Sequence, residues 1–217
     1  MAIEIITTKD GSKSLFLTDL NETYHSKFGA RTESEYVFIN AGFNYIKKHN
    51  IRIFEVGFGT GLNVLLTVLE NRNIKKNIYY ESIEKYPLST EILIPYMDFL
   101  TPDEKKIFMK IHQVGWNEIH QVDSNFKLLK KQVDLLSYKS DNQFDIVYFD
   151  AFAPDKQPDL WTEQIFEKMY RLLDTGGILV TYSAKGSVRR TLQSIGFTVE
   201  RLPGPPGKRE MLRAQKK

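Results

Sequence analysis

An acidic side chain stands directly after an apolar run in residues 144–161, which read FDIVYFDAFAPDKQPDLW. The run Ile146–Phe149 has the composition of a buried strand, and Asp150 ends it. A carboxylate at such a point can attract an ammonium group, orient its N–H bonds and help to remove a proton. Phe152 offers a ring face to a base or a cation. We interpret Asp150 and Phe152 as catalytic candidates; the alternatives are a cap or turn former and a core-packing ring.

Alternating glycines follow another apolar run, in the segment EVGFGTG at residues 55–61. Glycines between a strand and a helix let the backbone turn tightly and approach a ligand closely. The third glycine comes one residue too early for a dinucleotide fingerprint, and the absence of a P-loop lysine argues against an ATPase. The pattern resembles the cofactor loop of class I S-adenosylmethionine (SAM)-dependent methyltransferases. Glu55, Gly57, Gly59 and Gly61 are therefore cofactor-binding candidates, although Glu55 is also open to a structural role beside backbone amides.

Two further acids are expected at strand ends. Glu84 follows the apolar run 78–83, and its two oxygens suit the hydroxyls of a ribose. Asp123 is expected to end the third strand, at 120–122, where it would accept from an adenine amino group. Because the carboxyl ends of parallel strands share one rim, we expect Glu84, Asp123 and Asp150 to share one ligand site. Taken alone, each acid is equally an ordinary cap or surface residue.

The order of elements predicts an α/β fold with helices on both faces of a mostly parallel sheet. Strands are expected at 51–56, 78–83, 120–122, 145–149 and 178–183, the last after a turn at 174–177. Helices are expected at 62–71, from residue 89, over 101–120, after Asp123, and at 162–173 and 188–195. The segments 197–202 and 210–214 are joined by the short loop PGPPGK, so they must pair antiparallel.

Residues 1–50 are expected to form a small N-terminal extension. They predict a β-hairpin over 3–17 that turns at Asp10-Gly11, a loop over 21–32 and a helix over 33–48. Residues 51–217 then form one compact domain with a Rossmann-like, class I methyltransferase fold whose last strand is antiparallel.

Composition excludes several other classes of protein. With 217 residues and 41% hydrophobic side chains, the chain can bury one domain core. It has no cysteine, which excludes disulfides and a thiolate nucleophile and fits a reducing cytoplasm. No apolar stretch has the length of a membrane span or a signal-peptide core, so no membrane association is expected. The four histidines lack metal-site spacing and are expected to be structural, which predicts a metal-free mechanism.

The net charge of +3 is distributed unevenly. Residues 185–217 hold nine lysines and arginines against two acids, whereas residues 1–184 are net negative. This polarity indicates an anionic partner near the C-terminal segment, with a solvated basic surface as the alternative. Five cations are candidates for nucleic-acid phosphates, fixing position without reading sequence: Lys185, Arg189, Arg190, Lys208 and Arg209.

Several longer stretches carry a more specific resemblance. They are FDAFAPDKQPDLW, GKREML near the C-terminus, GFGTGLN at 57–63, IEKYPL at 83–88, and the N-terminal run from Tyr24 to Phe38. They resemble the methyltransferase half of the bacterial tRNA 5-methylaminomethyl-2-thiouridine biosynthesis family, over nearly the whole chain. The resemblance implies methylation of the amine of 5-aminomethyl-2-thiouridine at the tRNA wobble position, with the anticodon stem-loop as partner.

The same resemblance implies roles for individual residues. It gives the three glycines, Glu84 and Asp123 to SAM, and it places Asp150 and Phe152 beside a target base that has left its stack. Tyr24 and Ser26 are expected to close over the cofactor. Trp116 and Trp161 are expected to pack in the core.

Two departures from the family bear on activity. Its bifunctional members continue into a flavin-dependent oxidase domain, whereas this sequence ends at Lys217 without a second glycine fingerprint, so we expect no FAD and no oxidase activity. Ala151 stands where some members have glycine, and we expect no change of chemistry from it. The open alternatives are an N-methyltransferase of a small amine and a catalytically silent SAM- or RNA-binding module; an aminopropyl transferase would need an acidic glycine signature that is not found.

Overall fold

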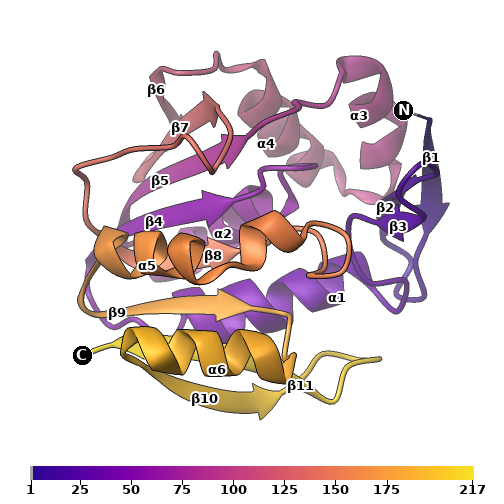
Figure 1. The fold of residues 1–217 in the computed structure, drawn as a ribbon. Coiled ribbons are helices and arrows are strands. Elements are labelled where there is room, and N and C mark those ends of the chain that lie inside the picture. The colour runs from indigo at the N-terminus through magenta and orange to yellow at the C-terminus, as the bar shows by residue number, and fades with distance from the viewer. Residues whose placement is uncertain (1) are drawn as a thin grey trace.

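A central eight-stranded sheet organises the computed structural model, which describes residues 2–217 (Figure 1). Five parallel strands form its middle, in the order β9 (Leu173–Thr181), β8 (Phe144–Phe149), β4 (Asn50–Val56), β5 (Asn77–Glu84) and β7 (Phe126–Gln132). Every residue of β8 is buried, as expected for a parallel strand covered on both faces. The predicted α/β class is confirmed.

Antiparallel strands close both edges of the sheet. At one edge, β10 (Phe197–Pro203) and β11 (Glu210–Lys216) form a hairpin, and β11 pairs antiparallel with β9. The predicted antiparallel pairing of the last two strands is therefore confirmed. β9 begins at Leu173, earlier than expected, because residues 174–177 form an irregularity within the ladder to β8 and do not end it.

The third parallel strand lies later in the chain than the sequence suggested. β6 (Ile119–Asp123) pairs antiparallel with β7, so a hairpin stands where a helix was expected after Asp123. The lysines of β7 make this segment less apolar than a typical buried strand, so the sequence did not predict it. Lys130 is nevertheless buried, with its ammonium over the rings of Phe58 and Trp116. Long lysine stems can line an apolar surface in this way.

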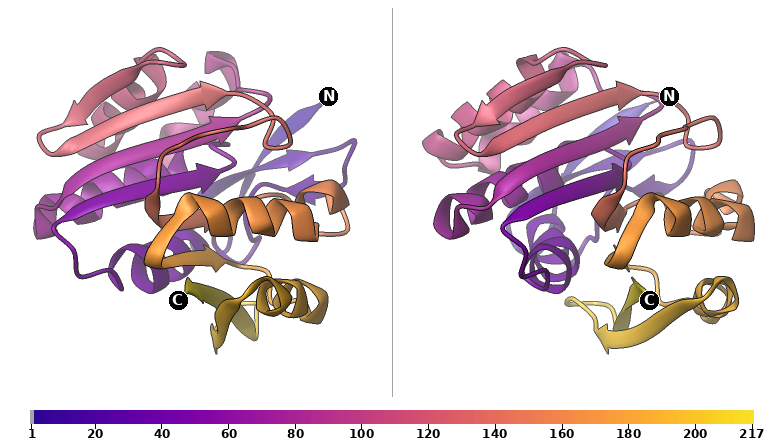
Figure 2. Two further views of the ribbon diagram at one scale, coloured as in Figure 1. Left: turned by 60° about the vertical axis from the view of Figure 1, so that its left-hand side comes forward. Right: turned by 90° about the vertical axis from the view of Figure 1, so that its left-hand side faces the viewer.

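Helices cover both faces of the sheet (Figure 2). One face packs against α2 (Leu62–Ile74), α4 (Pro102–Gln113) and the helix formed by α1 (Ala30–Ser34) and η1 (Glu35–Phe43). The other packs against α5 (Glu163–Leu172) and α6 (Gly186–Ile195). Three short helices complete the chain: α3 (Thr90–Tyr96), η2 (Met97–Phe99) and η3 (Pro158–Trp161). Two helices are shorter than expected, since α4 ends at Gln113 and η1 at Phe43.

A separate three-stranded sheet lies beside the carboxyl ends of the central strands (Figure 1). It consists of β1 (Ile3–Thr7), β2 (Lys13–Leu17) and β3 (Glu22–Thr23), so the predicted hairpin is confirmed and β3 is an addition. The helix that follows joins the main core, where Val37 and Phe38 pack with strand residues. The division of the chain at residue 50 stays a prediction.

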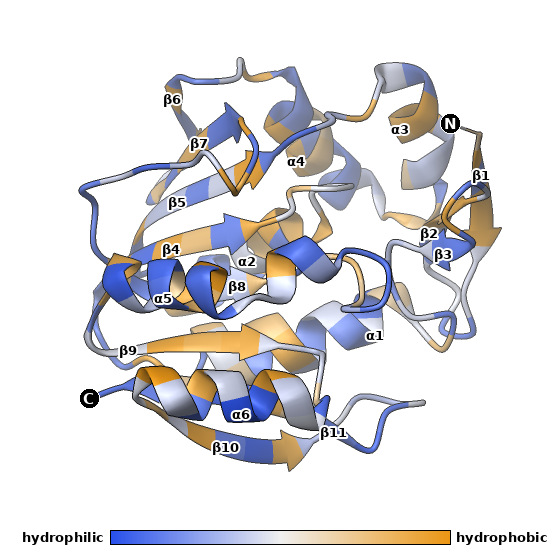
Figure 3. Ribbon diagram, in the orientation of Figure 1, coloured by the Kyte–Doolittle hydropathy of each residue, from blue (hydrophilic) through white to orange (hydrophobic). Residues whose placement is uncertain are grey.

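The hydropathy of the residues matches this layered arrangement: β4 and β9 are largely apolar, and α5 and α6 carry polar outer faces (Figure 3).

Two isoleucines test the assigned core. Ile53 in β4 is 0% exposed, whereas Ile119 in the edge strand β6 is 57% exposed. We expect Ile53→Ala to lower the free energy of unfolding by about 3 kcal/mol, because it leaves a cavity in the core. Ile119→Ala is the matched control and should cost less than about 1 kcal/mol. Urea unfolding followed by circular dichroism measures both; equal losses would contradict the assigned core.

Candidate active site

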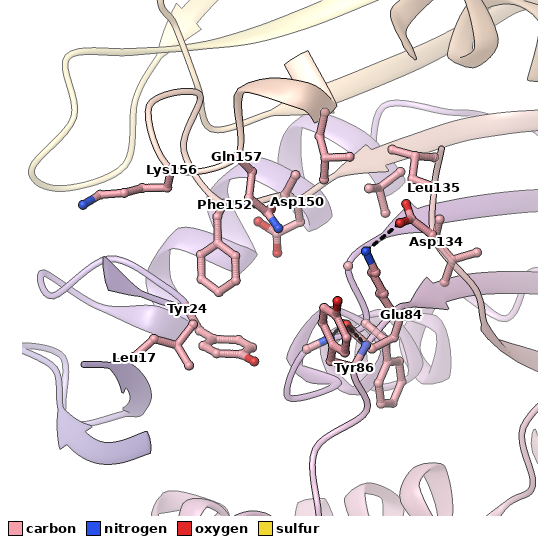
Figure 4. A pocket seen from close by; sticks show the side chains of 18 of the residues that line it. Leu17, Tyr24, Glu84, Tyr86, Asp134, Leu135, Asp150, Phe152, Lys156 and Gln157 are labelled. Atoms are coloured by element: carbon pink, nitrogen blue, oxygen red, sulfur yellow. Dashed lines mark hydrogen bonds and ion pairs between the residues drawn. The ribbon is translucent and has the colours of Figure 1, made fainter. Parts of the chain in front are cut away.

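A cavity of about 360 Å³ opens at the carboxyl ends of the parallel strands (Figure 4). The glycine loop and Glu84 line one part of it, and the loop that starts at Asp150 lines the part next to the glycine loop. Leu17, in β2, and Tyr24, directly after β3, also line the cavity. The cavity is therefore built from segments that are far apart in the sequence, and the sheet topology brings them together.

The glycine loop needs its first glycine because of the neighbouring strand. Gly57 has a φ of +90°, and a Cβ added there would lie 2.8 Å from the carbonyl oxygen of Asp150. Gly57 and Gly59 line the cavity. Gly61 does not line it; a Cβ at Gly61 would meet the rings of Phe58 and His112, so this glycine serves packing beneath the loop.

Glu84 lies where the sequence placed it, at the end of β5 and on the cavity wall. Its Oε2 accepts a hydrogen bond from the N–H of Gly59 at 3.1 Å, and its Oε1 accepts from the N–H of Tyr86 at 2.9 Å. Burial raises the pKa of this carboxyl, while the backbone donors oppose the shift. Each oxygen keeps a further lone pair, so Glu84 suits the two hydroxyls of a ribose.

Glu55 does not reach the cavity, contrary to its prediction as a cofactor residue. It is 0% exposed, beneath the loop, and accepts a hydrogen bond from the hydroxyl of Ser82 at 2.5 Å. Its other oxygen has no hydrogen-bond partner among residues 2–217. Burial raises the pKa of Glu55 to about 8, so the side chain is largely protonated at neutral pH. Its partner is a hydroxyl and not a backbone amide.

Asp123 is also misplaced by the sequence prediction. It pairs with Phe126 at the start of β7, so it lies at the end of the strands away from the cavity. There it forms an ion pair with Arg72 at 2.6 Å. The acid that follows the third parallel strand is Asp134, which lines the cavity and pairs with Lys85 at 2.8 Å. Asp134 was missed because the hairpin of β6 and β7 was read as a strand and a helix.

Asp150 stands at the centre of the site. Its N–H donates to the carbonyl of Val56 at 3.1 Å, and its carboxylate accepts from Nδ2 of Asn63 at 2.8 Å. Burial, reinforced by the charge of Glu33, raises the pKa of Asp150 to about 7. This group therefore changes charge near neutral pH. Asn63 was not singled out from the sequence, although it lies in the quoted GFGTGLN stretch.

Hydrogen bonds with three side chains hold the loop after Asp150. The hydroxyl of Tyr182 donates to the carbonyl of Ala151 at 2.8 Å, and the indole N–H of Trp161 donates to that of Phe152 at 2.8 Å. The N–H of Phe152 donates to Oε1 of Gln157 at 3.1 Å. The ring of Phe152 meets the edge of Tyr24, with centroids 5.0 Å apart. The loop therefore presents Asp150 and Phe152 in a fixed arrangement.

The remaining aromatic and N-terminal predictions have mixed outcomes. Trp161 is buried in the core and Trp116 packs against Phe58, which confirms their predicted packing. Tyr24 lines the cavity as expected. Ser26 does not line it; its N–H donates to the carboxylate of Glu33.

The five predicted phosphate-binding cations lie outside the cavity. Lys185 pairs with Asp155 at 2.8 Å, and Lys208 pairs with Glu33. Arg190 and Arg209 are exposed and Arg189 is half-buried, and none of the three forms an ion pair within residues 2–217. In the same range, no group of three or more His, Asp and Glu side chains is arranged to hold a metal ion. None of the helices there has the length and apolar character needed to cross a bilayer.

Glu84 and Asp123 allow a direct test of the cofactor wall. We expect Glu84→Ala to weaken SAM binding at least about tenfold, because the carboxylate that would accept hydrogen bonds from two ribose hydroxyls is lost. Asp123→Ala should change affinity less than about twofold, since its carboxylate is at the other end of the sheet. Isothermal titration calorimetry with SAM measures both; the reverse ranking would contradict this assignment.

Several curated proteins are similar in sequence to most of this chain. It is 32% identical over 201 residues to the tRNA 5-methylaminomethyl-2-thiouridine biosynthesis bifunctional protein MnmC of Campylobacter hominis, covering 90% of the chain and 30% of that protein. The MnmC of Actinobacillus pleuropneumoniae is 32% identical over 219 residues, covering 90% and 32%. The chain thus spans about a third of the length of these relatives.

Solved structures agree with the fold. The crystal structure of MNMC2 from Aquifex aeolicus superposes with a TM-score of 0.78 at 29% identity, covering all of this chain and 71% of that one. Spermidine synthase from Thermotoga maritima, at 14% identity and a TM-score of 0.59, shares the fold alone. The family model described as S-adenosyl-L-methionine-dependent methyltransferase matches residues 98–217. The chain therefore belongs to this SAM-dependent methyltransferase family and is a homologue of the MnmC methyltransferase domain.

Proposed function

We propose that this chain methylates the aminomethyl nitrogen of 5-aminomethyl-(2-thio)uridine at the wobble position of tRNA. The observation that carries the proposal is the half-buried carboxylate of Asp150, which shares one cavity with the glycine loop and Glu84. A carboxylate beside the methyl donor can attract the ammonium form of an amine and orient its N–H bonds. The likeness to MnmC proteins, whose name contains the methylaminomethyl product, supports this choice of substrate.

The cavity residues have separate roles in the proposed methyl transfer. Bound SAM supplies an electrophilic methyl group on a sulfonium. Asp150 attracts the substrate amine, and its carboxylate form can accept or orient an N–H so that the lone pair is free to attack. Asn63 fixes the carboxylate through its hydrogen bond at 2.8 Å. Phe152 and Tyr24 offer ring faces and edges to a pyrimidine.

A tRNA partner would approach over the basic C-terminal segment. Arg190 and Arg209, which are exposed, are the cations most available for phosphates, with Arg189 and Lys185 beside them. Such contacts position the RNA and make affinity depend on salt. The wobble base lies in a single-stranded loop, where unstacking into a pocket costs least.

Methyl transfer to tRNA tests the proposal. The protein is incubated with labelled SAM and tRNA that carries 5-aminomethyluridine at the wobble position, and the nucleosides are identified after digestion. We expect labelled 5-methylaminomethyluridine, and no label in the same tRNA with an unmodified wobble uridine. SAM binding without labelled tRNA would contradict the proposal and favour a small-amine enzyme or a silent module.

Asp150 should control the rate of this reaction without controlling SAM binding. We expect Asp150→Ala to lower the single-turnover rate at least about 100-fold, because the amine loses the carboxylate that attracts and orients it. The affinity for SAM should stay within about threefold of the unchanged protein, because Asp150 is assigned to the amine and not to the cofactor. Asp141→Asn, which removes an exposed carboxylate before β8, is the control. An unchanged rate in Asp150→Ala would remove this residue from the mechanism.

The pH dependence of the rate follows from the same group. Because the pKa of Asp150 is raised to about 7, its carboxylate form is lost as the pH falls below that value. We expect the logarithm of the single-turnover rate to rise with pH and to change slope near pH 7. The change of slope should be absent in Asp150→Ala. A profile that rises without a break through this region would contradict the role of Asp150.

A further inference from the structure

An ion pair outside the cavity joins a helix of the N-terminal region to the C-terminal hairpin. Lys208, in the loop between β10 and β11, donates to the carboxylate of Glu33 in α1. Glu33 is 5% exposed, and its other oxygen accepts from the N–H of Ser26 at 2.9 Å. A buried carboxylate needs such partners, because an unpaired charge at this position would be strongly destabilised.

This pair is connected to the loop that carries Asp150. The ammonium of Lys208 lies 3.8 Å from the centroid of the Tyr182 ring. The hydroxyl of Tyr182 donates to the carbonyl of Ala151, the residue next to Asp150. Burial and the nearby acids raise the pKa of Tyr182 well above its ordinary value, so the hydroxyl remains a donor. Lys208 therefore packs on the side chain that fixes the loop.

The two charges also act on Asp150 with opposite sign. Glu33 favours the protonated form of Asp150, and Lys208 favours the carboxylate. The other polar groups around Asp150 come from four elements: Asn63 in α2, Glu55 in β4, Tyr80 in β5 and Tyr182 after β9. Burial lowers the pKa of His25 to about 4, while Glu33 raises it and Lys208 lowers it, so His25 is neutral. Among these groups, Lys208 is the one cation.

We propose that Glu33 and Lys208 are positioning residues for Asp150, holding its loop through Tyr182 and opposing each other's electrostatic effect on its carboxylate. The catalytic meaning of this inference rests on the proposed methyl transfer, but the ionisation of Asp150 does not. It also changes the role of Lys208 from its sequence prediction. Its ammonium is engaged with a buried acid and an aromatic ring, so it is not free for a phosphate.

Carbon-13 NMR of labelled aspartate carboxyls tests the inference without any substrate. The Asp150 signal is identified by its loss in Asp150→Asn and followed from about pH 5 to about pH 9. We expect its midpoint to rise by at least about half a pH unit in Lys208→Met and to fall by a similar amount in Glu33→Gln. Lys208→Arg should leave it near the original value. Arg201→Met, which removes a paired cation from the same hairpin, is the control and should not move it.

The directions of these shifts separate an electrostatic role from a merely structural one. Loss of packing alone would move both midpoints in the same direction, and no movement in either variant would overturn the inference. Should Lys208→Met fail to fold, Lys208→Gln and Glu33→Gln decide the question. In the methylation assay, Lys208→Met should lower kcat at least about tenfold with a smaller change in KM for tRNA. A pure rise in KM with reduced salt dependence would instead restore Lys208 as a phosphate contact.

If the unchanged protein does not methylate tRNA, the proposed function fails while the NMR midpoints still decide the inference. If it does methylate tRNA and the midpoints do not move, the proposed function stands and the positioning role fails.

Discussion

The close contact between two backbone segments determines the arrangement of this site. The carbonyl oxygen of Asp150 would lie 2.8 Å from a Cβ on Gly57, and the N–H of Asp150 donates to the carbonyl of Val56. The end of β8 therefore lies directly against the start of the glycine loop. A ligand held by the loop is, as a result, adjacent to the acid that ends the next strand. Parallel neighbours in an open sheet make this possible, because their carboxyl ends share one edge.

Burial gives the acids of this edge their chemical character. Glu55, Glu84 and Asp150 all have raised pKa values, with burial as the main cause in each. Their partners differ, and so do their roles. Glu84 accepts two backbone N–H groups beside the cavity, Glu55 meets a hydroxyl below it, and Asp150 has the amide of Asn63. Acidic side chains on or directly after three neighbouring strands thus have three different roles: proposed ligand binding, support beneath the loop and proposed catalysis.

The sequence predicted the parts of the site that depend on local pattern. The glycine loop, Glu84 and Asp150 each follow a recognisable apolar run, and the Gly/Pro loop correctly required an antiparallel last pair. Asp134 was missed because β7 is rich in lysine and hides its strand character. The pair of Glu33 and Lys208 could not be found at all, since its members are 175 residues apart and no local pattern links them. Contacts of that kind depend on the complete fold.

We propose that one cavity holds the methyl donor and the target amine side by side. A crystal structure with S-adenosylhomocysteine and 5-methylaminomethyluridine bound together tests it most directly. We expect the ribose hydroxyls at Glu84, the adenosyl part along Gly57 and Gly59, and the methylamino nitrogen within hydrogen-bonding distance of Asp150. A nucleoside bound with its nitrogen away from Asp150, or an adenosyl group outside this cavity, would contradict it.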